Sequence, residues 1–248
     1  MFDYTKKGKW WDIGVKVIQG CTRVSKGCKH CWSLAMEHRF NQGTDISFHF
    51  NRLYEKMKKK DPTAFAIWND LFHESVPFEY LEQVFSKMVM YEHHNYLILT
   101  KRPQRVIDFL LWYWKDDKLT LENMHPVPSN IWIGVTAENQ KMADERIPLL
   151  LKIPAIRFVS CEPLLDHIDG YFYDKNGKPI ENWISKVNWI IAGAETGAVK
   201  RPMKNEWIRS LWKQCHAEGK PFFDKQNALG LDIKEMPEHE QIGNPITV

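Results

Sequence analysis

The sequence contains no long apolar stretch. None of its hydrophobic runs reaches the ~18 residues of a membrane-spanning helix, although 44% of its 248 residues are hydrophobic and 11 are tryptophan. The first residues, MFDYTKKGKWWD, have no apolar segment of the kind found in secretory signals. We therefore expect a protein without a membrane segment that works in the cytoplasm.

The net charge is small, and the chain has few cysteines. The formal net charge is only +3, which neither demands nor excludes a nucleic-acid partner. The chain has five cysteines, an odd number. In a chain without a leader this number indicates a reducing compartment and metal ligation rather than a disulfide framework. Nothing in the composition indicates an oligomeric state.

Three of the five cysteines lie close together. Cys21, Cys28 and Cys31 form a C-x6-C-x2-C array, and soft thiolates at such spacing bind zinc or an iron–sulfur cluster. A tetrahedral zinc site would need a fourth ligand, for which His30 and His38 are the candidates. A [4Fe–4S] cluster held by three cysteines would leave one iron open to another molecule. The spacing alone leaves both alternatives open.

The rest of the chain alternates between short apolar runs and helical patterns. This rhythm predicts an α/β fold, a partial (β/α) TIM-like barrel of about six to seven parallel strands in a single domain spanning 1–248. A hairpin or loop is expected at about 168–186, and an irregular tail at 227–248. The expected strands are 11–19, 64–68, 95–99, 130–135, 156–159, 189–192 and 221–223. The expected helices are 32–40, 77–90, 104–114, 143–151 and 206–219.

Each expected strand ends in hydrogen-bonding, charged or thiol side chains. In parallel α/β barrels the functional site is built from the carboxyl ends of the strands. We therefore expect these side chains to face a single mouth. They are Cys21, Cys28, Cys31, Asn69, Asp70, Thr100, Lys101, Thr136, Glu138, Cys161, Glu162, Glu195, Lys225 and Gln226.

A three-cysteine loop after the first strand of a partial barrel resembles the radical S-adenosylmethionine superfamily. The first gap of six residues departs from that superfamily's common C-x3-C-x2-C motif. The departure is similar to a narrower group, the phage and prophage three-cysteine-motif family, a domain of unknown function with a distant likeness to spore photoproduct lyase. Besides the cysteine loop, the resemblance rests on 69–73, 99–103, 134–139, 144–147, 158–165, 193–197, 201–203 and 225–226.

The resemblance implies two cofactors and their ligands. Cys21, Cys28 and Cys31 would bind a [4Fe–4S] cluster, whose fourth iron takes S-adenosylmethionine, and reduction would generate a 5′-deoxyadenosyl radical. By strand order, Asn69 and Asp70 would hold the methionine ammonium. Thr136, Glu138 and Glu195 would bind the ribose, carboxylate and adenine groups of S-adenosylmethionine. The reduction implies an external electron donor of the flavodoxin or ferredoxin type.

Three further residues form the expected catalytic set. Cys161 ends a strand beside Glu162, and a thiol there could return a hydrogen atom to a product radical, as in the similar photoproduct lyase. The alternative for Cys161 is a buried core cysteine. Lys101 could bind a phosphate or a substrate carboxylate, or pair with carboxylates at the mouth.

Cations with interleaved aromatic residues, such as Lys56–Lys60 and Lys101-Arg102, favour a nucleobase substrate. Together with the resemblance to phage proteins, this predicts a lyase or isomerase that acts on a modified or damaged pyrimidine in DNA or a nucleotide. The reaction would be rearrangement, repair or hypermodification. If the gene is phage-encoded, the enzyme would work in the host cytoplasm. The alternative is a non-catalytic, zinc-stapled nucleic-acid-binding protein.

Overall fold

Seven short strands form one parallel sheet in which each strand lies beside its predecessor in the chain. The computed structural model describes residues 9–40, 45–116, 118–197 and 199–237. The strands are β1 (Ile13–Lys16), β4 (Ala64–Trp68), β5 (Asn95–Thr100), β6 (Ile131–Thr136), β7 (Ile156–Cys161), β10 (Trp189–Ala192) and β11 (Phe222–Asp224), paired in that order. This order is that of a barrel opened between its first and last strands, so all carboxyl ends lie on one side.

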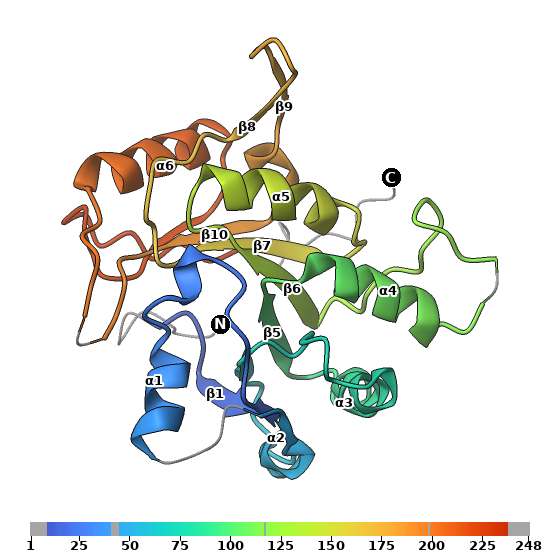
Figure 1. The fold of residues 1–248 in the computed structure, drawn as a ribbon. Helices are drawn as coiled ribbons and strands as arrows, with labels where there is room; N and C mark the ends of the chain where they lie inside the picture. The colour runs from blue at the N-terminus through green and yellow to red at the C-terminus, as the bar shows by residue number, and fades with distance from the viewer. Residues whose placement is uncertain (1–8, 41–44, 117, 198, 238–248) are drawn as a thin grey trace.

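Helices cover the outer side of this curved sheet (Figure 1). They are α3 (Phe78–Met90), α4 (Pro103–Tyr113), α5 (Gln140–Leu151) and α6 (Asn205–Ala217), with α1 (Trp32–Arg39) and α2 (Phe50–Met57) near the first strand. The prediction of a mixed α/β, partial TIM-like barrel with parallel strands is therefore confirmed. Within the described ranges, no helix is both long and apolar enough to cross a bilayer.

The structure refines three segments. The first expected strand is divided into β1 and a two-residue strand β2 (Ile18–Gln19), which pairs antiparallel with β3 (Ser47–Phe48). At 168–186 lies an antiparallel hairpin of β8 (Tyr171–Tyr173) and β9 (Pro179–Asn182), which projects from the body in Figure 1. In the tail, an isolated bridge joins Phe223 to Lys234, and residues 238–248 lie outside the described part.

Alternation along the strands separates two apolar layers. Along each strand, alternate residues point to opposite faces of the sheet. One set packs against the helices, and the other fills the concave inner side. In β7, for example, Val159 and Cys161 belong to the outer layer, and Ile156 and Phe158 to the inner layer. The inner layer consists of Trp10, Ala64, Leu97, Trp132, Ile156, Phe158, Trp189, Ile191 and Phe223. The concave side is thus filled by large rings rather than left as a pore.

Glycines on the strands make room for these rings. A Cβ at Gly134 of β6 would lie 2.4 Å from the nearest ring atom of Phe158 on β7. A Cβ at Gly14 of β1 would lie 2.0 Å from the indole of Trp68. Such distances are far inside van der Waals contact, so only glycine permits the observed ring positions.

We predict that Gly134→Ala lowers the free energy of unfolding by about 1–3 kcal/mol, because the Phe158 ring must leave its position in a close-packed layer. Urea denaturation measures this cost. In a Phe158→Leu background the same substitution should cost clearly less, since the two nearest ring atoms, Cζ and Cε2, are gone. Equal costs in both backgrounds would contradict the ring contact as the cause.

Candidate functional site

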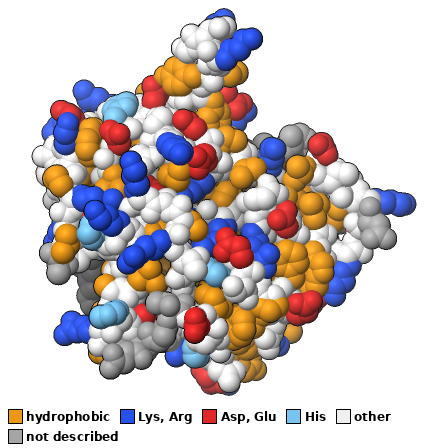
Figure 2. Space-filling model, in the orientation of Figure 1, with side chains coloured by type: hydrophobic (Ala, Val, Ile, Leu, Met, Phe, Trp, Pro, Cys, Tyr) orange, Lys and Arg blue, Asp and Glu red, His pale blue; other side chains and the backbone are white. Residues whose placement is uncertain are grey.

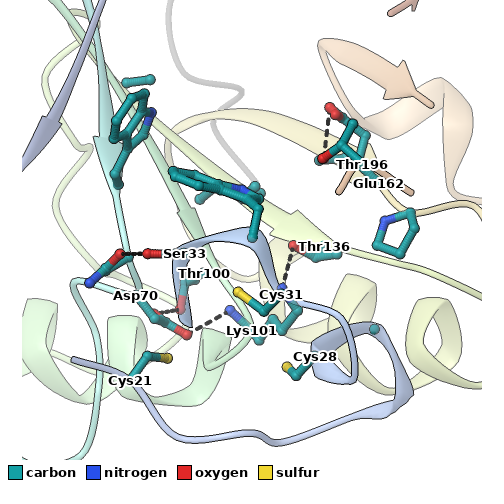
Figure 3. A pocket seen from close by; sticks show the side chains of 18 of the residues that line it. Cys21, Cys28, Cys31, Ser33, Asp70, Thr100, Lys101, Thr136, Glu162 and Thr196 are labelled. Atoms are coloured by element: carbon teal, nitrogen blue, oxygen red, sulfur yellow. Dashed lines mark hydrogen bonds between the residues drawn. The ribbon is translucent and has the colours of Figure 1, made fainter. Parts of the chain in front are cut away.

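A cavity lies above the aromatic inner layer, at the carboxyl ends of the strands. Its volume is about 220 Å³, slightly below the roughly 300–1,000 Å³ of most small-molecule sites, so a larger ligand would also occupy its rim. Figure 3 shows the thiols and the polar strand ends around this space. The polar and thiol residues that line it include Cys21, Thr22, Cys28, His30, Cys31, Ser33, Asn69, Asp70, Thr100, Lys101, Arg102, Thr136, Ser160, Glu162, Glu195, Thr196 and Lys225.

The three cysteines reach the cavity on a loop with little regular structure. The loop, residues 20–31, contains one short 3₁₀ turn, Lys26–Cys28, and ends at Cys31, the N-cap of α1. All three cysteines are free thiols. Cys21 Sγ contacts the carbonyl of Thr22 at 3.5 Å, and Cys28 Sγ lies 3.8 Å from the Ser25 hydroxyl. These contacts are weak, so the thiols remain available as ligands.

Arg102, after β5, provides the first anchor of the loop. Its guanidinium donates to Thr22 Oγ1 at 2.8 Å, to Asp70 Oδ2 at 2.7 Å and to Glu74 Oε1 at 2.7 Å. Burial lowers the pKa of Arg102, but the two carboxylates together outweigh it, so the net pKa is raised and the charge is fixed. Asp70 also accepts from the Thr100 hydroxyl at 2.5 Å and from the Lys101 backbone N–H at 3.1 Å. The start of the cysteine loop is thus tied to the ends of β4 and β5.

Glu138, after β6, provides the second anchor. Its Oε1 accepts the backbone N–H of Gly27 at 3.0 Å, and its Oε2 accepts from Arg146 of α5 at 2.9 Å. Burial raises the pKa of Glu138, but the Arg146 charge and further hydrogen bonds outweigh it, so the net pKa is lowered. A Cβ at Gly27 would lie 2.8 Å from this carboxylate. The loop therefore needs glycine here to approach the anchor.

Arg201, beyond β10, provides the third anchor. It donates from Nη1 to the backbone carbonyl of Lys26 at 2.9 Å, and from Nε to Glu195 Oε2 at 2.9 Å. Its Nη2 also contacts Glu195 Oε1. The hydrogen bonds from Arg201 lower the pKa of Glu195, so this carboxylate is charged, and Arg201 occupies three of its lone-pair sites. The middle of the loop is thereby held from the far side of the sheet.

The base of the loop rests on a buried glutamate of α1. Glu37 Oε1 accepts from Lys16 Nζ at 3.2 Å, from Gly20 N at 3.3 Å and from Asn69 Nδ2 at 3.1 Å. Asn69 has a left-handed backbone, with φ at 63°, and its amide oxygen accepts from the Ser33 hydroxyl at 2.5 Å. A strained residue that bridges loop, strand and helix is typical of a functional site.

The charges at the thiol end favour ionisation of one cysteine. Burial raises the pKa of Cys28, but the Lys101 ammonium and hydrogen bonds at Val24 and Ser25 outweigh it, so the net pKa lies below the ordinary value. Burial and the Asp70 carboxylate raise the pKa of Cys21. Lys101 Nζ donates to Thr136 Oγ1 at 3.3 Å. The chemistry of the donor set, three thiols beside a cation, fits an iron–sulfur cluster.

The structure brings together eleven of the fourteen strand-end residues expected at the mouth. The three that do not line the cavity are Glu138, Cys161 and Gln226. Glu138 holds the loop from behind, and the Gln226 amide braces the backbone of Ala194. Cys161 lies in the outer apolar layer with no exposed surface, and burial raises its pKa. It is placed as the buried core cysteine and does not reach a ligand in the cavity.

Two carboxylates of the expected cofactor-binding set make their hydrogen bonds within the protein. All four lone-pair sites of the Asp70 carboxylate are used, since Phe72 N donates to Oδ1 at 3.3 Å besides the partners given above. Both oxygens of Glu195 bind Arg201. Asp70 is therefore saturated by protein partners, and Glu195 is committed to its ion pair with Arg201, which holds the loop. The expected set missed the anchoring Arg102 and Arg201, although Arg102 follows a strand end and Arg201 lies in residues 201–203, one of the stretches that carry the family resemblance.

No three His, Cys, Asp or Glu side chains gather closely enough to hold a single metal ion in the part of the chain that is described. The fit of a cluster therefore rests on the thiols and their surroundings, and not on a preformed ligand sphere.

Comparison with known proteins places the chain among relatives without an assigned role. A family model described as "Protein of unknown function (DUF5131)" matches residues 5–239. No curated protein and no solved structure matches the chain.

We predict that Arg201→Met speeds alkylation of Cys28 in the metal-free protein about fivefold, because the loop loses the hydrogen bond at the Lys26 carbonyl, worth ~1 kcal/mol. Mass spectrometry of iodoacetamide-treated protein measures this rate at each cysteine. Lys204→Met is the matched control, since Lys204 pairs with Glu206 at the surface and has no described ion pair or hydrogen bond with residues 20–31. An unchanged Cys28 rate would show that this anchor does not restrain the loop.

Proposed function

The chain belongs to the DUF5131 family of proteins of unknown function, and from its site we propose that it is a radical S-adenosylmethionine enzyme. The observation that carries the proposal is the cysteine loop. It presents three free thiols to a cavity at the carboxyl ends of a parallel half-barrel, and the sheet holds it at three points. Three thiolates leave one iron of a [4Fe–4S] cluster without a protein ligand.

In this proposal Cys21, Cys28 and Cys31 hold the cluster. When bound, the cluster and S-adenosylmethionine supply one-electron cleavage to a 5′-deoxyadenosyl radical. The protein's own contribution is position and shielding. Lys101 and Thr136 face the cavity beside the thiols and are polar groups not consumed by the loop anchors. We assign them to the polar groups of the cofactor in place of Asp70 and Glu195.

The apolar part of the cavity suits a flat substrate and limits access of water. Trp10, Trp11, Trp32 and Trp68 all line it, and Trp32 meets Trp68 edge to face at 5.0 Å between centroids. Aromatic rings stack on nucleobases irrespective of their sequence. We therefore retain a modified or damaged pyrimidine, in DNA or as a nucleotide, as the proposed substrate, and rearrangement, repair or hypermodification as the reaction type.

The outer surface beside the thiols fits an acidic electron donor. Along residues 21–40, Arg23, Lys26, Lys29 and Arg39 are exposed, and the single acidic residue, Glu37, is fully buried. Trp32, Met36 and Phe40 are exposed by 42%, 41% and 59% and recur every fourth residue, so they form one face of α1. Figure 2 shows Lys and Arg side chains over the half of the molecule where Figure 1 places α1 and the cysteine loop. An apolar centre with a basic rim matches a small acidic redox protein.

Cys28→Ala should abolish the brown colour of anaerobically reconstituted protein, because the cluster loses one of its three ligands. The unaltered chain should bind about four irons and four sulfides and release 5′-deoxyadenosine when reduced with S-adenosylmethionine. Cys215→Ala is the matched control, because Cys215 lies on α6 in the outer apolar layer. This variant should still bind the cluster and release 5′-deoxyadenosine. A colourless protein that holds one zinc and stays inert would instead favour the zinc-stapled alternative.

Met36→Glu with Arg39→Glu should slow reduction by a flavodoxin-type donor about tenfold at low ionic strength, because it reverses the charge and polarity of the proposed docking face. Reduction by dithionite should stay unchanged. The control pair is Lys87→Glu with Met90→Glu, a basic residue and an exposed methionine on α3. Equal slowing by both pairs of substitutions would contradict docking at α1.

A further inference from the structure

One ion pair of the cavity takes no part in holding the cysteine loop. Glu162, after β7, contacts Lys225, after β11, and both side chains line the cavity. The pairs whose members bond to the loop are Asp70–Arg102, Glu138–Arg146, Glu195–Arg201 and Lys16–Glu37. Among the described contacts, Glu162 and Lys225 make none to residues 20–31. This pair is therefore free to serve a ligand.

The hydrogen-bonding capacity of the pair is not exhausted. A carboxylate offers about four lone-pair sites. In Glu162 three of them are taken by Trp10 Nε1 at 3.2 Å, by Ser160 Oγ at 3.3 Å and by Lys225 Nζ. The Lys225 ammonium has three protons, and Glu162 accepts one. The pair thus presents one acceptor site beside further ammonium protons.

The charge and shape of this corner select among ligand classes. Glu162 neutralises Lys225, so the corner does not attract a phosphate or a carboxylate. Lys225 Nζ also lies 5.7 Å from the ring centroid of Trp11, which places an indole wall next to the polar pair. An uncharged, flat ligand with a donor next to an acceptor fits both features, and the edge of a nucleobase is such a group.

We propose that Glu162, Lys225 and Trp11 form a nucleobase subsite. Glu162 accepts the ring N–H of the base, Lys225 donates to the adjacent carbonyl, and Trp11 contacts the ring face. Figure 3 shows Glu162 on the opposite side of the cavity from Cys21 and Cys28, so the bound base lies between this subsite and the thiols. The role of this subsite rests on the proposed function. The subsite recognises one part of the proposed substrate, the base.

Thymidine and 3-methylthymidine test the subsite on the whole chain without a cluster. Titration calorimetry should show saturable binding of thymidine. The binding of 3-methylthymidine should be at least about tenfold weaker, because the methyl group removes the donor and meets Glu162. Glu162→Gln should weaken thymidine binding to a similar degree. Glu82→Gln, which breaks the exposed pair of Glu82 with Lys115 instead, should leave it unchanged.

Three outcomes would overturn the subsite: no thymidine binding, equal binding of the two nucleosides, or displacement of thymidine by inorganic phosphate or by S-adenosylhomocysteine. The comparison of nucleosides uses the unaltered chain, so it stands even where Glu162→Gln fails to fold. Thymidine binding by a chain that forms no cluster would contradict the proposed function and support the subsite. Cluster formation and 5′-deoxyadenosine release without thymidine binding would support the proposed function and contradict the subsite.

Discussion

The position of the thiols depends on the tethering of an irregular loop to three separate strand ends. Residues 20–31 have one short 3₁₀ turn and no sheet partner, so their backbone cannot satisfy itself. Glu138 and Arg201 bind the loop backbone at Gly27 N and Lys26 O, and Arg102 binds the Thr22 hydroxyl, at 2.8–3.0 Å. A loop fixed from three sides loses its conformational freedom during folding rather than at the moment of ligand binding. The thiols are thus arranged by the sheet and not by their local sequence.

The same tethers explain why so many charges lie in the protein interior. Glu138 and Glu37 have no exposed surface, and a buried carboxylate is costly unless it is paired and hydrogen-bonded. Glu138 meets that condition through Arg146 and Gly27. Glu37 meets it at one oxygen only, since Oε2 has no described partner. Each buried carboxylate therefore favours one geometry of the loop, because its hydrogen bonds to the loop are made only in that geometry.

The repeated apolar runs of the sequence predict all seven strands of the sheet, because buried parallel strands need continuous apolar residues whatever surrounds them. The polar residues that follow each run also predict the mouth. The sequence does not show which of two adjacent strand-end residues points inward, and this is why Cys161 was expected in the cavity while Ser160 lines it. Phe158 determines which residues of β7 face the inner side of the sheet. Its ring fits there only because Gly134, its neighbour on β6, lacks a Cβ. Long-range partners such as Arg201 and Lys26 have no local signal either.

The cavity has two ends of different charge, and this difference orients whatever it binds. At the thiol end, Lys101 has no carboxylate within ion-pair distance among the described residues, so its charge acts on Cys28 and lowers the pKa of that thiol. At the other end, Glu162 cancels Lys225. An anionic group gains attraction only at the first end, and an uncharged hydrogen-bonding edge loses nothing at the second. Trp10 lines the space and donates to Glu162, so the aromatic floor also fixes the neutral end. The carboxylate of the proposed cofactor and the uncharged base of the proposed substrate would therefore be sorted to opposite ends before any reaction begins.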